Sequence, residues 1–341
     1  MEKTMKVLNI VASKDCRIEE RPIPQITEPN QVLIRVRAVG LCGSDKATYL
    51  GLPTRKLPLV PCHEFAGEIV QTGSEVNKFN NGDRVAVEPM LVCGECYACK
   101  SGRSNVCHSL KTVGSHCDGA LQEYFLTTED KLHIIPDAMS YRQATLIEPY
   151  TIGAQVNERL GTKKGDKMLI HGAGPIGIIT MIVAKKIGAE VAISQGSAGR
   201  REFAKKLGAD MVINPNVDDI DEKIAEFTDG KGADIIVDSA GVPELMTKAV
   251  HQAAVGGRLG NICFAQKEIE LDIQEFVMKK LSIHGSRLQT NQFVNIIENF
   301  SDVILENDSI ITDVFPLERA AEAFALLIDR NDSTCKIVID C

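Results

Sequence analysis

Four cysteines in the segment LVCGECYACKSGRSNVC are spaced to bind one metal ion. Cys93, Cys96, Cys99 and Cys107 follow the pattern C-x2-C-x2-C-x7-C. Two-residue gaps let successive thiolates converge on a tetrahedral ion from a tight loop, and four thiolates leave no open coordination position, which is typical of structural Zn²⁺. An iron–sulfur cluster is an alternative, but its usual spacing places the last cysteine three residues on and before a proline. Unligated thiols are the third interpretation.

A second set of possible ligands is scattered along the chain. Cys42 lies in GLCGSDK, His63 and Glu64 lie in VPCHEFAGE, and Glu148 lies in LIEPY. Ligands that meet only in the fold are typical of a catalytic metal, where three protein groups leave one position for water or substrate. Spacing alone also allows a buried small residue at Cys42 and a surface turn at Glu148.

A glycine-rich turn predicts a dinucleotide site. The segment HGAGPIG contains G-x-G-x-x-G between the apolar run KMLI and a helical pattern, and the run EVAIS follows the helix. In that context the glycines allow a tight turn and a close approach of the backbone to a pyrophosphate at the helix N-terminus. A turn that serves only packing is the alternative. The predicted cofactor-binding residues of this turn are Gly172, Gly174, Pro175, Ile176 and Gly177.

The choice between NAD and NADP stays open in the sequence. About 20 residues beyond the glycine turn, an Asp or Glu normally binds the adenosine ribose diol. Gln195 occupies this place, followed by Ser197 and Arg200. A neutral amide removes the charge that would repel a 2′-phosphate, whereas Gln195 can also bind the diol, and Arg200 fits equally a solvated residue of a first helical turn.

The elements that must position these residues fall into two regions. Short β-branched runs punctuated by turn residues fill the first 140 residues and predict a β-domain. From residue 167, six apolar runs alternate with amphipathic segments, which predicts a doubly wound parallel sheet. Two helical stretches and the strand-like CKIVIDC follow residue 288. The predicted fold is therefore a β-domain plus an α/β domain.

Composition excludes several function classes. The 341 residues carry 38 Lys and Arg against 46 Asp and Glu, a net charge of −8, which disfavours sequence-independent nucleic-acid binding. We expect no signal peptide and no membrane-spanning segment, hence a cytoplasmic protein. In that compartment thiols stay reduced, so the 11 cysteines are interpreted as metal ligands or buried residues before disulfides.

Taken in this order, the motifs make the sequence resemble the zinc-dependent medium-chain dehydrogenases, the alcohol, sorbitol and threonine dehydrogenase family. The resemblance covers the whole chain and includes GLCGSD, H-E-F-x-G-E, the four-cysteine lobe, GSHCDGALQEY, LIEPY, GAGPIG and CKIVIDC. It implies a GroES-like β-domain followed by a Rossmann domain. The expected boundaries are 1–149 for the first, 150–288 for the second, and 289–341 for a C-terminal segment that returns to the first.

The resemblance also implies the catalytic metal. Carried over by motif, Cys42 and His63 are zinc ligands, and Glu64 is an adjacent acid that can bind the ion. Glu148 matches the position that holds the metal directly or through water in the sorbitol dehydrogenase branch. Two zinc ions per chain are expected, one catalytic and one structural.

Near these ligands the resemblance assigns two roles and shows two departures. Ser44 matches the hydroxyl that bonds the substrate alcohol, and Asp45 matches the carboxylate that orients the ligand histidine. Where the family has a glycine before that histidine, this chain has Cys62, and Ala47 replaces the usual proton-relay histidine. Lys46 is then a candidate helper for the departing proton.

Within the family, VGSHCDG, LIEPYTIGAQV and HGSRLQTNQF look most like the L-gulonate and L-galactonate 5-dehydrogenases, the RspB-like branch. A sugar acid carries a carboxylate, so its site needs a cation away from the metal. Arg287 is the preferred candidate, with His116 as a further substrate residue. Lys46, Arg55 and Lys56 are other candidates, the last two fitting ordinary solvated residues better.

The predicted activity is hydride transfer between a secondary alcohol of a sugar acid and NAD or NADP. The candidate catalytic residues are Ser44, Lys46, Glu64 and Arg287. The alternatives are a polyol or threonine dehydrogenase and, outside enzymes, an NAD(P)-binding redox sensor, which Ala47 and Cys62 would favour. The resemblance implies a homodimer or homotetramer, with GRLGNICF (residues 257–264) at an edge-to-edge interface.

Overall fold

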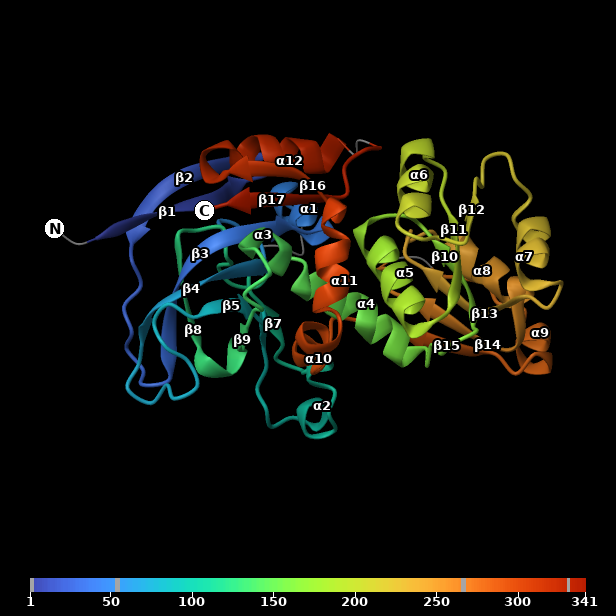
Figure 1. Ribbon diagram of the computed structural model, residues 1–341, viewed down its shortest axis with the longest axis horizontal. Coiled ribbons are helices and arrows are strands. Elements are labelled where there is room, and N and C mark those ends of the chain that lie inside the picture. The colour runs from blue at the N-terminus through green and yellow to red at the C-terminus, as the bar shows by residue number, and fades with distance from the viewer. Residues whose placement is uncertain (1–2, 53–55, 265–267, 330–331) are drawn as a thin grey trace. The chain divides into compact units, whose positions relative to one another are not determined.

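A computed structural model describes residues 3–52, 56–264, 268–329 and 332–341 of the chain. These separate into two compact units (Figure 1). The first comprises Met1–Glu148 with Phe293–Cys341, and the second comprises Pro149–Gln292. Arg55, a candidate cation of the sequence, lies outside the described residues.

A seven-stranded sheet forms the centre of the first unit. Its strand order is β16-β17-β3-β4-β5-β9, with β8 pairing β3, and every pair is antiparallel except β16 with β17. The strands are β3 (Gln31–Leu41), β4 (Glu64–Thr72), β5 (Arg84–Val87), β8 (Tyr124–Thr128), β9 (Leu132–Ile134), β16 (Ile311–Pro316) and β17 (Lys336–Asp340). The C-terminal strand β17 thus pairs directly with β3 of the N-terminal region.

Two small ladders and short helices complete the first unit. The ladders are the hairpin β1 (Thr4–Ala12) with β2 (Asp15–Pro22), and β6 (Met90–Leu91) with β7 (Lys111–Thr112). The helices are α1 (Gly43–Tyr49), α2 (Tyr97–Lys100), α3 (Tyr141–Ala144), α10 (Gln292–Asn299), α11 (Ser301–Glu306) and α12 (Ala320–Asp329). One apolar core joins β1, β3, β4 and β17 to α12, through side chains such as Ile10, Ile34, Phe65 and Phe324.

The second unit contains a six-stranded parallel sheet of order β12-β11-β10-β13-β14-β15. Its strands are β10 (Lys167–His171), β11 (Glu190–Ser194), β12 (Met211–Ile213), β13 (Ala233–Asp238), β14 (Ala253–Asn261) and β15 (Ser282–Gly285). The order reverses at β10, as in a Rossmann sheet, where ligands bind at the carboxyl ends beside the reversal. The predicted doubly wound sheet is confirmed, and all six predicted apolar runs are strands.

Helices cover both faces of this sheet because right-handed crossovers extend it on both sides of β10, first through β11 to β12 and then from β13 to β15. They are α5 (Pro175–Ile187), α6 (Ala198–Lys206), α7 (Ile220–Thr228), α8 (Pro243–Gln252) and α9 (Ile273–Met278), while α4 (Ile147–Arg159) precedes β10. Side chains of α7 and α8, including Phe227 and Met246, share one core with Leu169 and Ile236 of the sheet. β15 is an edge strand of this sheet, and β14, which contains residues 257–261, has a partner strand on each side.

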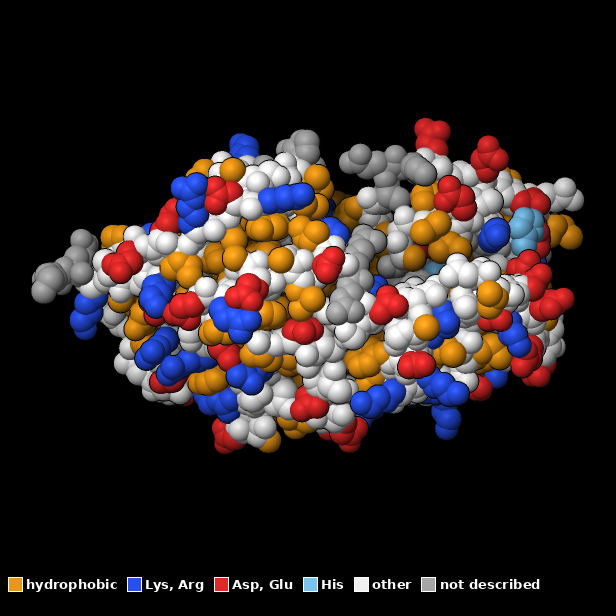
Figure 2. Space-filling view, turned by 90° about the horizontal axis from the view of Figure 1, so that it is seen from above, with side chains coloured by type: hydrophobic (Ala, Val, Ile, Leu, Met, Phe, Trp, Pro, Cys, Tyr) orange, Lys and Arg blue, Asp and Glu red, His pale blue; other side chains and the backbone are white. Residues whose placement is uncertain are grey.

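The face of the molecule drawn in Figure 2 carries charged side chains of both signs, as the composition of the sequence indicates. On the face drawn in Figure 2, the acidic and basic side chains of the described residues are interspersed. No helix in the described part of the chain is both long enough and apolar enough to cross a bilayer.

His171, at the end of β10, predicts a pH dependence of stability. The residue is 1% exposed, and neither ring nitrogen has a hydrogen-bond partner among the described groups. Burial, with a smaller contribution from the charge of Lys248, lowers the pKa of His171 to about 4. Because the folded pKa lies below the unfolded one, near ~6.5, the neutral ring supports folding above that pH. We expect up to about 3 kcal/mol to be lost as the pH falls from ~6.5 through ~4.

Urea denaturation at several pH values, compared with His171→Gln, measures this loss. The unsubstituted chain should lose stability more steeply than His171→Gln over this range. Parallel curves for the two proteins would contradict the assignment.

Candidate functional site

Three strand ends meet at one edge of the seven-stranded sheet and carry the scattered candidate ligands. Since β3 runs antiparallel to both β4 and β17, its C-terminal end lies beside their starts. Gly40 of β3 pairs with Glu64 of β4, and Leu41 pairs with Ile337 of β17. Cys42 is the residue that directly follows β3, and His63 is the residue that directly precedes β4. The sheet register therefore brings together residues that are far apart in the sequence.

Cys42, His63 and Glu64 form a possible metal centre. Their ligand atoms lie within 4.8 Å of one another. His63 is 7% exposed and Glu64 is 1% exposed. A thiol, an imidazole and a carboxylate are donors that zinc accepts, and three protein ligands leave a position for substrate. The donor set fits the metal that the sequence predicts.

Glu148, at the start of α4, lies outside this three-residue set but is electrostatically coupled to it. Burial is the main cause that raises the pKa of Glu148 to about 7; the charge of His63 acts against the rise, and the carboxylate of Glu64 adds to it. A buried carboxyl group beside a second one is well suited to bind a cation.

Asp45 links the segment that carries Cys42 to the segment that precedes His63 through hydrogen bonds to two backbone amides. One of its carboxylate oxygens accepts a hydrogen bond from the Cys42 amide at 2.8 Å, and the other accepts one from the Cys62 amide at 3.1 Å. Cys62 has a φ of 74°, in the left-handed region that favours glycine, and its side chain is fully buried. Asp45 therefore acts on the segment before His63 through the backbone, where it holds a strained residue in place.

Lys336 is a buried cation of this site that the sequence interpretation missed. Its ammonium group, at the start of β17, forms an ion pair with Glu64 and donates to the Leu41 carbonyl at 2.9 Å. Burial, the largest single influence, would lower the pKa of Lys336, but Glu64, Cys42 and Glu148 together raise that pKa above its usual value. The pair crosses β3 at Gly40, where a Cβ atom would lie 2.5 Å from Glu64 Oε2. A lysine directly before the apolar run IVI of the strand KIVID was the signal in the sequence.

Three other predicted residues, Ser44, Lys46 and His116, also belong to the first unit. Ser44, in the first turn of α1, has a buried Oγ atom without a hydrogen-bond partner among the described groups. Lys46 donates to the Ile328 carbonyl at 3.4 Å, so α12 takes up part of its hydrogen-bonding capacity. His116 is exposed, and its Nδ1 atom accepts a hydrogen bond from the Thr112 amide at 3.1 Å.

The four-cysteine lobe lies between β6 and β7. The Sγ distances are 3.5 Å from Cys93 to Cys107, 3.6 Å from Cys96 to Cys99, 3.9 Å from Cys96 to Cys107 and 4.0 Å from Cys93 to Cys99. Backbone amides, foremost those of Cys99 and Cys93, lower the pKa of Cys96 to about 6 and of Cys107 to about 7. Sulfurs at this spacing fit one tetrahedral zinc ion. His108 also contacts the cluster, which the sequence interpretation missed.

The glycine turn of the second unit is built as a dinucleotide site requires. Gly172 has a φ of 101°, and a Cβ atom on Gly177 would lie 2.2 Å from the Gly172 carbonyl oxygen. Gly174 is the N-cap of α5 and carries no capping side chain, while Pro175 begins the helix. Nothing lies within 4 Å of a Cβ atom built on Gly174. The amides of the first helical turn therefore remain available to a pyrophosphate.

The residues predicted to meet the adenosine ribose cluster at the end of β11. The Ser197 hydroxyl accepts a hydrogen bond from the Arg200 amide and caps α6. Arg201, which the sequence interpretation passed over, donates to the carbonyls of Gln195 and Gly196 at 2.7 and 2.6 Å. It fixes the backbone that presents Gln195. Arg287 lies exposed in the second unit, just beyond β15.

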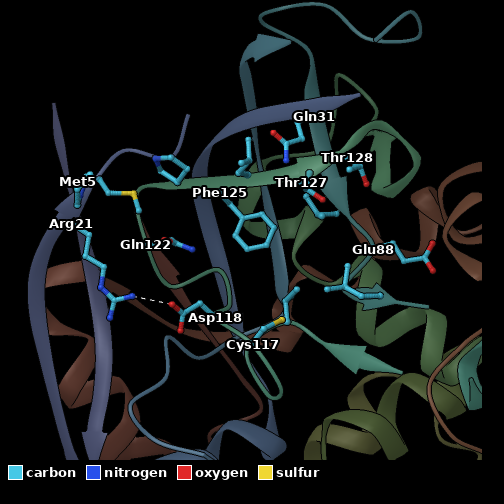
Figure 3. Close-up of a pocket in the computed structure, with 16 residues that line it drawn as sticks. Met5, Arg21, Gln31, Glu88, Cys117, Asp118, Gln122, Phe125, Thr127 and Thr128 are labelled. Atoms are coloured by element: carbon cyan, nitrogen blue, oxygen red, sulfur yellow. Dashed lines mark hydrogen bonds and ion pairs between the residues drawn. The ribbon is translucent and has the colours of Figure 1, made fainter. Parts of the chain in front are cut away.

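A cavity of about 630 Å³ also lies in the first unit, apart from the candidate ligands (Figure 3). Figure 3 shows the Arg21–Asp118 ion pair, 2.9 Å long, at its wall, with Phe125 facing the same space. Its lining includes Met5, Cys117 and Gln122, but no residue of the Cys42–His63–Glu64 set.

Comparison with known families matches both units. Residues 28–137 match the family described as alcohol dehydrogenase GroES-like domain. Residues 175–302 match the family described as zinc-binding dehydrogenase.

Individual relatives match along nearly the whole chain. The sequence is 33% identical to sorbitol dehydrogenase of Bacillus subtilis, over 99% of this chain and 97% of that protein. It is 32% identical to L-galactonate-5-dehydrogenase of Escherichia coli K12, over 98% and 99% of the two chains. Among solved structures, the RspB alcohol dehydrogenase of Escherichia coli CFT073 in complex with NADH is 33% identical, with a TM-score of 0.93 over 99% of each chain.

Proposed function

The chain belongs to the zinc-binding medium-chain alcohol dehydrogenases, and on that premise we propose that it oxidises a secondary alcohol of a sugar acid such as L-gulonate or L-galactonate. The enzyme class, a zinc-type polyol or sugar-acid dehydrogenase, follows from the family. The sugar acid as substrate, NAD or NADP as hydride acceptor and the individual residue roles are the proposal.

The observation that carries the proposal is the Cys42–His63–Glu64 set, in which His63 and Glu64 are buried and Cys42 is half-buried. Ser44 lies two residues after Cys42, in α1. Zinc bound there would supply the Lewis acidity that favours loss of the alcohol proton, while the dinucleotide would accept the hydride. Glu148, whose buried carboxyl group interacts electrostatically with His63 and Glu64, is proposed as a further carboxylate donor. The second zinc ion, in the four-cysteine lobe, would be structural.

Proton removal falls to Ser44. Its buried, unpartnered Oγ atom is free to accept a hydrogen bond from a substrate hydroxyl. Lys46, two residues on, is proposed to help the proton leave, because Ala47 cannot relay it. Asp45 positions the segments that carry Cys42 and His63, and does not itself touch substrate in this scheme.

A carboxylate on the substrate calls for a cation, and Arg287 is proposed to supply it. A guanidinium group can bind a carboxylate with two parallel hydrogen bonds. The likeness to L-galactonate-5-dehydrogenase supports a sugar acid. The likeness to sorbitol dehydrogenase, at 33% identity, favours the second candidate, a neutral polyol.

Arg287→Ala tests the assignment. We expect kcat/KM for L-gulonate to fall by about 10- to 100-fold, the value of one charge-assisted hydrogen bond, with kcat/KM for D-sorbitol nearly unchanged. Lys56→Ala, a second exposed cation, serves as the matched control and should change neither value. An equal loss on both substrates would remove Arg287 from substrate recognition.

The cofactor and the oligomeric state extend the proposal. Gln195 places no negative charge where a 2′-phosphate would lie, so we propose that NADP is accepted as well as NAD. Initial rates measured in parallel with NAD and NADP give the cofactor preference.

We also propose that the protein forms a homodimer or homotetramer through the edge strand β15, where Ile283 is exposed. Sedimentation analysis measures the oligomeric state, and a monomer would contradict this proposal.

A further inference from the structure

The metal lobe of the first unit holds five donor side chains for one tetrahedral ion. Besides the four cysteines, the Nδ1 atom of His108 lies 4.0 Å from Cys93 Sγ, and a ring nitrogen of His108 lies within 4.8 Å of Cys96 Sγ. The ligand atoms of Cys93, Cys96, Cys107 and His108 all lie within 4.8 Å of one another. A complete four-donor set therefore exists without Cys99.

The distances among the sulfurs that the two sets share suit one tetrahedral ion. Zinc–sulfur bonds of ~2.3 Å in a tetrahedron place the sulfurs about 3.8 Å apart. The three cysteines common to both sets are separated by 3.5 Å from Cys93 to Cys107 and 3.9 Å from Cys96 to Cys107. The 4.0 Å from His108 to Cys93 equals the 4.0 Å from Cys99 to Cys93.

We propose that His108 is an alternative zinc ligand of this lobe. When Cys99 does not bind the ion, His108 completes a site of three thiolates and one imidazole. Zinc accepts four thiolates, or three thiolates with one imidazole, in the same tetrahedral geometry. Cys99 and His108 contact the same two sulfurs, those of Cys93 and Cys96, so either one can fill the fourth position.

The position of His108 in the chain makes such an exchange accessible. It directly follows Cys107, so the backbone that carries one ligand already holds the imidazole at the cluster. The His108 side chain is exposed, which leaves room for the ring to turn. Replacing a thiolate by a neutral imidazole also reduces the net negative charge of the site by one. A lobe built this way keeps its metal after losing one thiol.

Zinc analysis of purified variants tests the proposal. Cys99→Ala should retain as much zinc per chain as the unsubstituted protein, and His108→Ala should do so as well. The double variant Cys99→Ala/His108→Ala should lose one equivalent. Cys107→Ala is the matched control: Cys107 belongs to both donor sets, so its removal should cost one equivalent whether or not His108 is present.

Cobalt substitution gives a second readout that does not depend on activity. The thiolate-to-cobalt charge-transfer intensity of Cys99→Ala should correspond to one thiolate fewer than that of the unsubstituted protein. Adding His108→Ala should then abolish the tetrahedral spectrum of this site. Thermal unfolding of the single variants shows whether each is folded.

Two outcomes would overturn the proposal. In the first, Cys99→Ala is folded but lacks one zinc. In the second, Cys99→Ala/His108→Ala keeps all the zinc of Cys99→Ala, so that water or another group fills the position. Each variant is compared with the unsubstituted chain prepared alongside it. The result is therefore independent of the substrate and of the zinc content of the Cys42–His63 site.

Discussion

In the metal-free protein, replacing Lys336 by methionine should lower the free energy of unfolding by about 3–5 kcal/mol, the usual cost of removing one partner from a buried ion pair. The side chains of Lys336 and Glu64 are 2% and 1% exposed, so the carboxylate left behind cannot reach water. Methionine keeps most of the side-chain volume, and the loss then reports the charge rather than a cavity. Urea denaturation followed by far-ultraviolet circular dichroism measures it.

The double variant Lys336→Met/Glu64→Gln distinguishes the effect of an unpaired charge from the effect of substituting the residue at position 336. Removing both charges leaves no unpaired buried ion, so this variant should recover most of the stability that Lys336→Met loses. The interpretation fails if Lys336→Met costs less than about 1 kcal/mol, or if the double variant is no more stable than the single one.

His63→Ala should reduce kcat by about 10³-fold or more and remove one zinc per chain. The buried imidazole is one of three donors whose ligand atoms lie within 4.8 Å of one another, and losing it leaves two donors of that set, Cys42 and Glu64. Several kcal/mol of Lewis-acid stabilisation would disappear with the ion, and ~1.4 kcal/mol corresponds to tenfold in rate. Steady-state rates and metal analysis of the same preparation measure both effects.

The control for His63→Ala is the other metal lobe. The zinc held by the four cysteines should remain, so the variant should keep one equivalent and its cobalt form should retain an intense thiolate spectrum. An enzyme that keeps both zinc equivalents, or full activity with only one, would exclude His63 as a catalytic ligand.

The fold could be predicted from the sequence where patterns of neighbouring residues determine it. The run KMLI, the glycine turn and the following helix appear as β10, Gly172 and α5 at the expected places, because each depends on neighbours in sequence. The hairpin β1–β2 and the strand β16 were not identified. β2 consists mostly of charged residues, and β1 is held in part by residues far along the chain, such as Leu121, whose carbonyl accepts a hydrogen bond from the Leu8 amide.

Most residues of the site could be predicted from the sequence, but the contacts among them could not. Cys42, His63 and Glu64 carry motifs, whereas Lys336 meets Glu64 only because β17 pairs with β3 in one particular register. Likewise, nothing in the sequence places Cys62 at a positive φ with its amide bound to Asp45. Long-range register decides these contacts, and a single sequence does not encode it in any short pattern.

The most direct test of the central claim is the ratio of kcat/KM for L-gulonate to that for D-sorbitol, measured by the absorbance of the reduced nicotinamide. The two substrates differ at one carbon, which is a carboxylate in the first and a primary alcohol in the second. A site built for a sugar acid should favour L-gulonate by about 10- to 100-fold, through one charge-assisted hydrogen bond to the carboxylate. A ratio of one or below, or no dinucleotide reduction with any sugar acid tested, would contradict it.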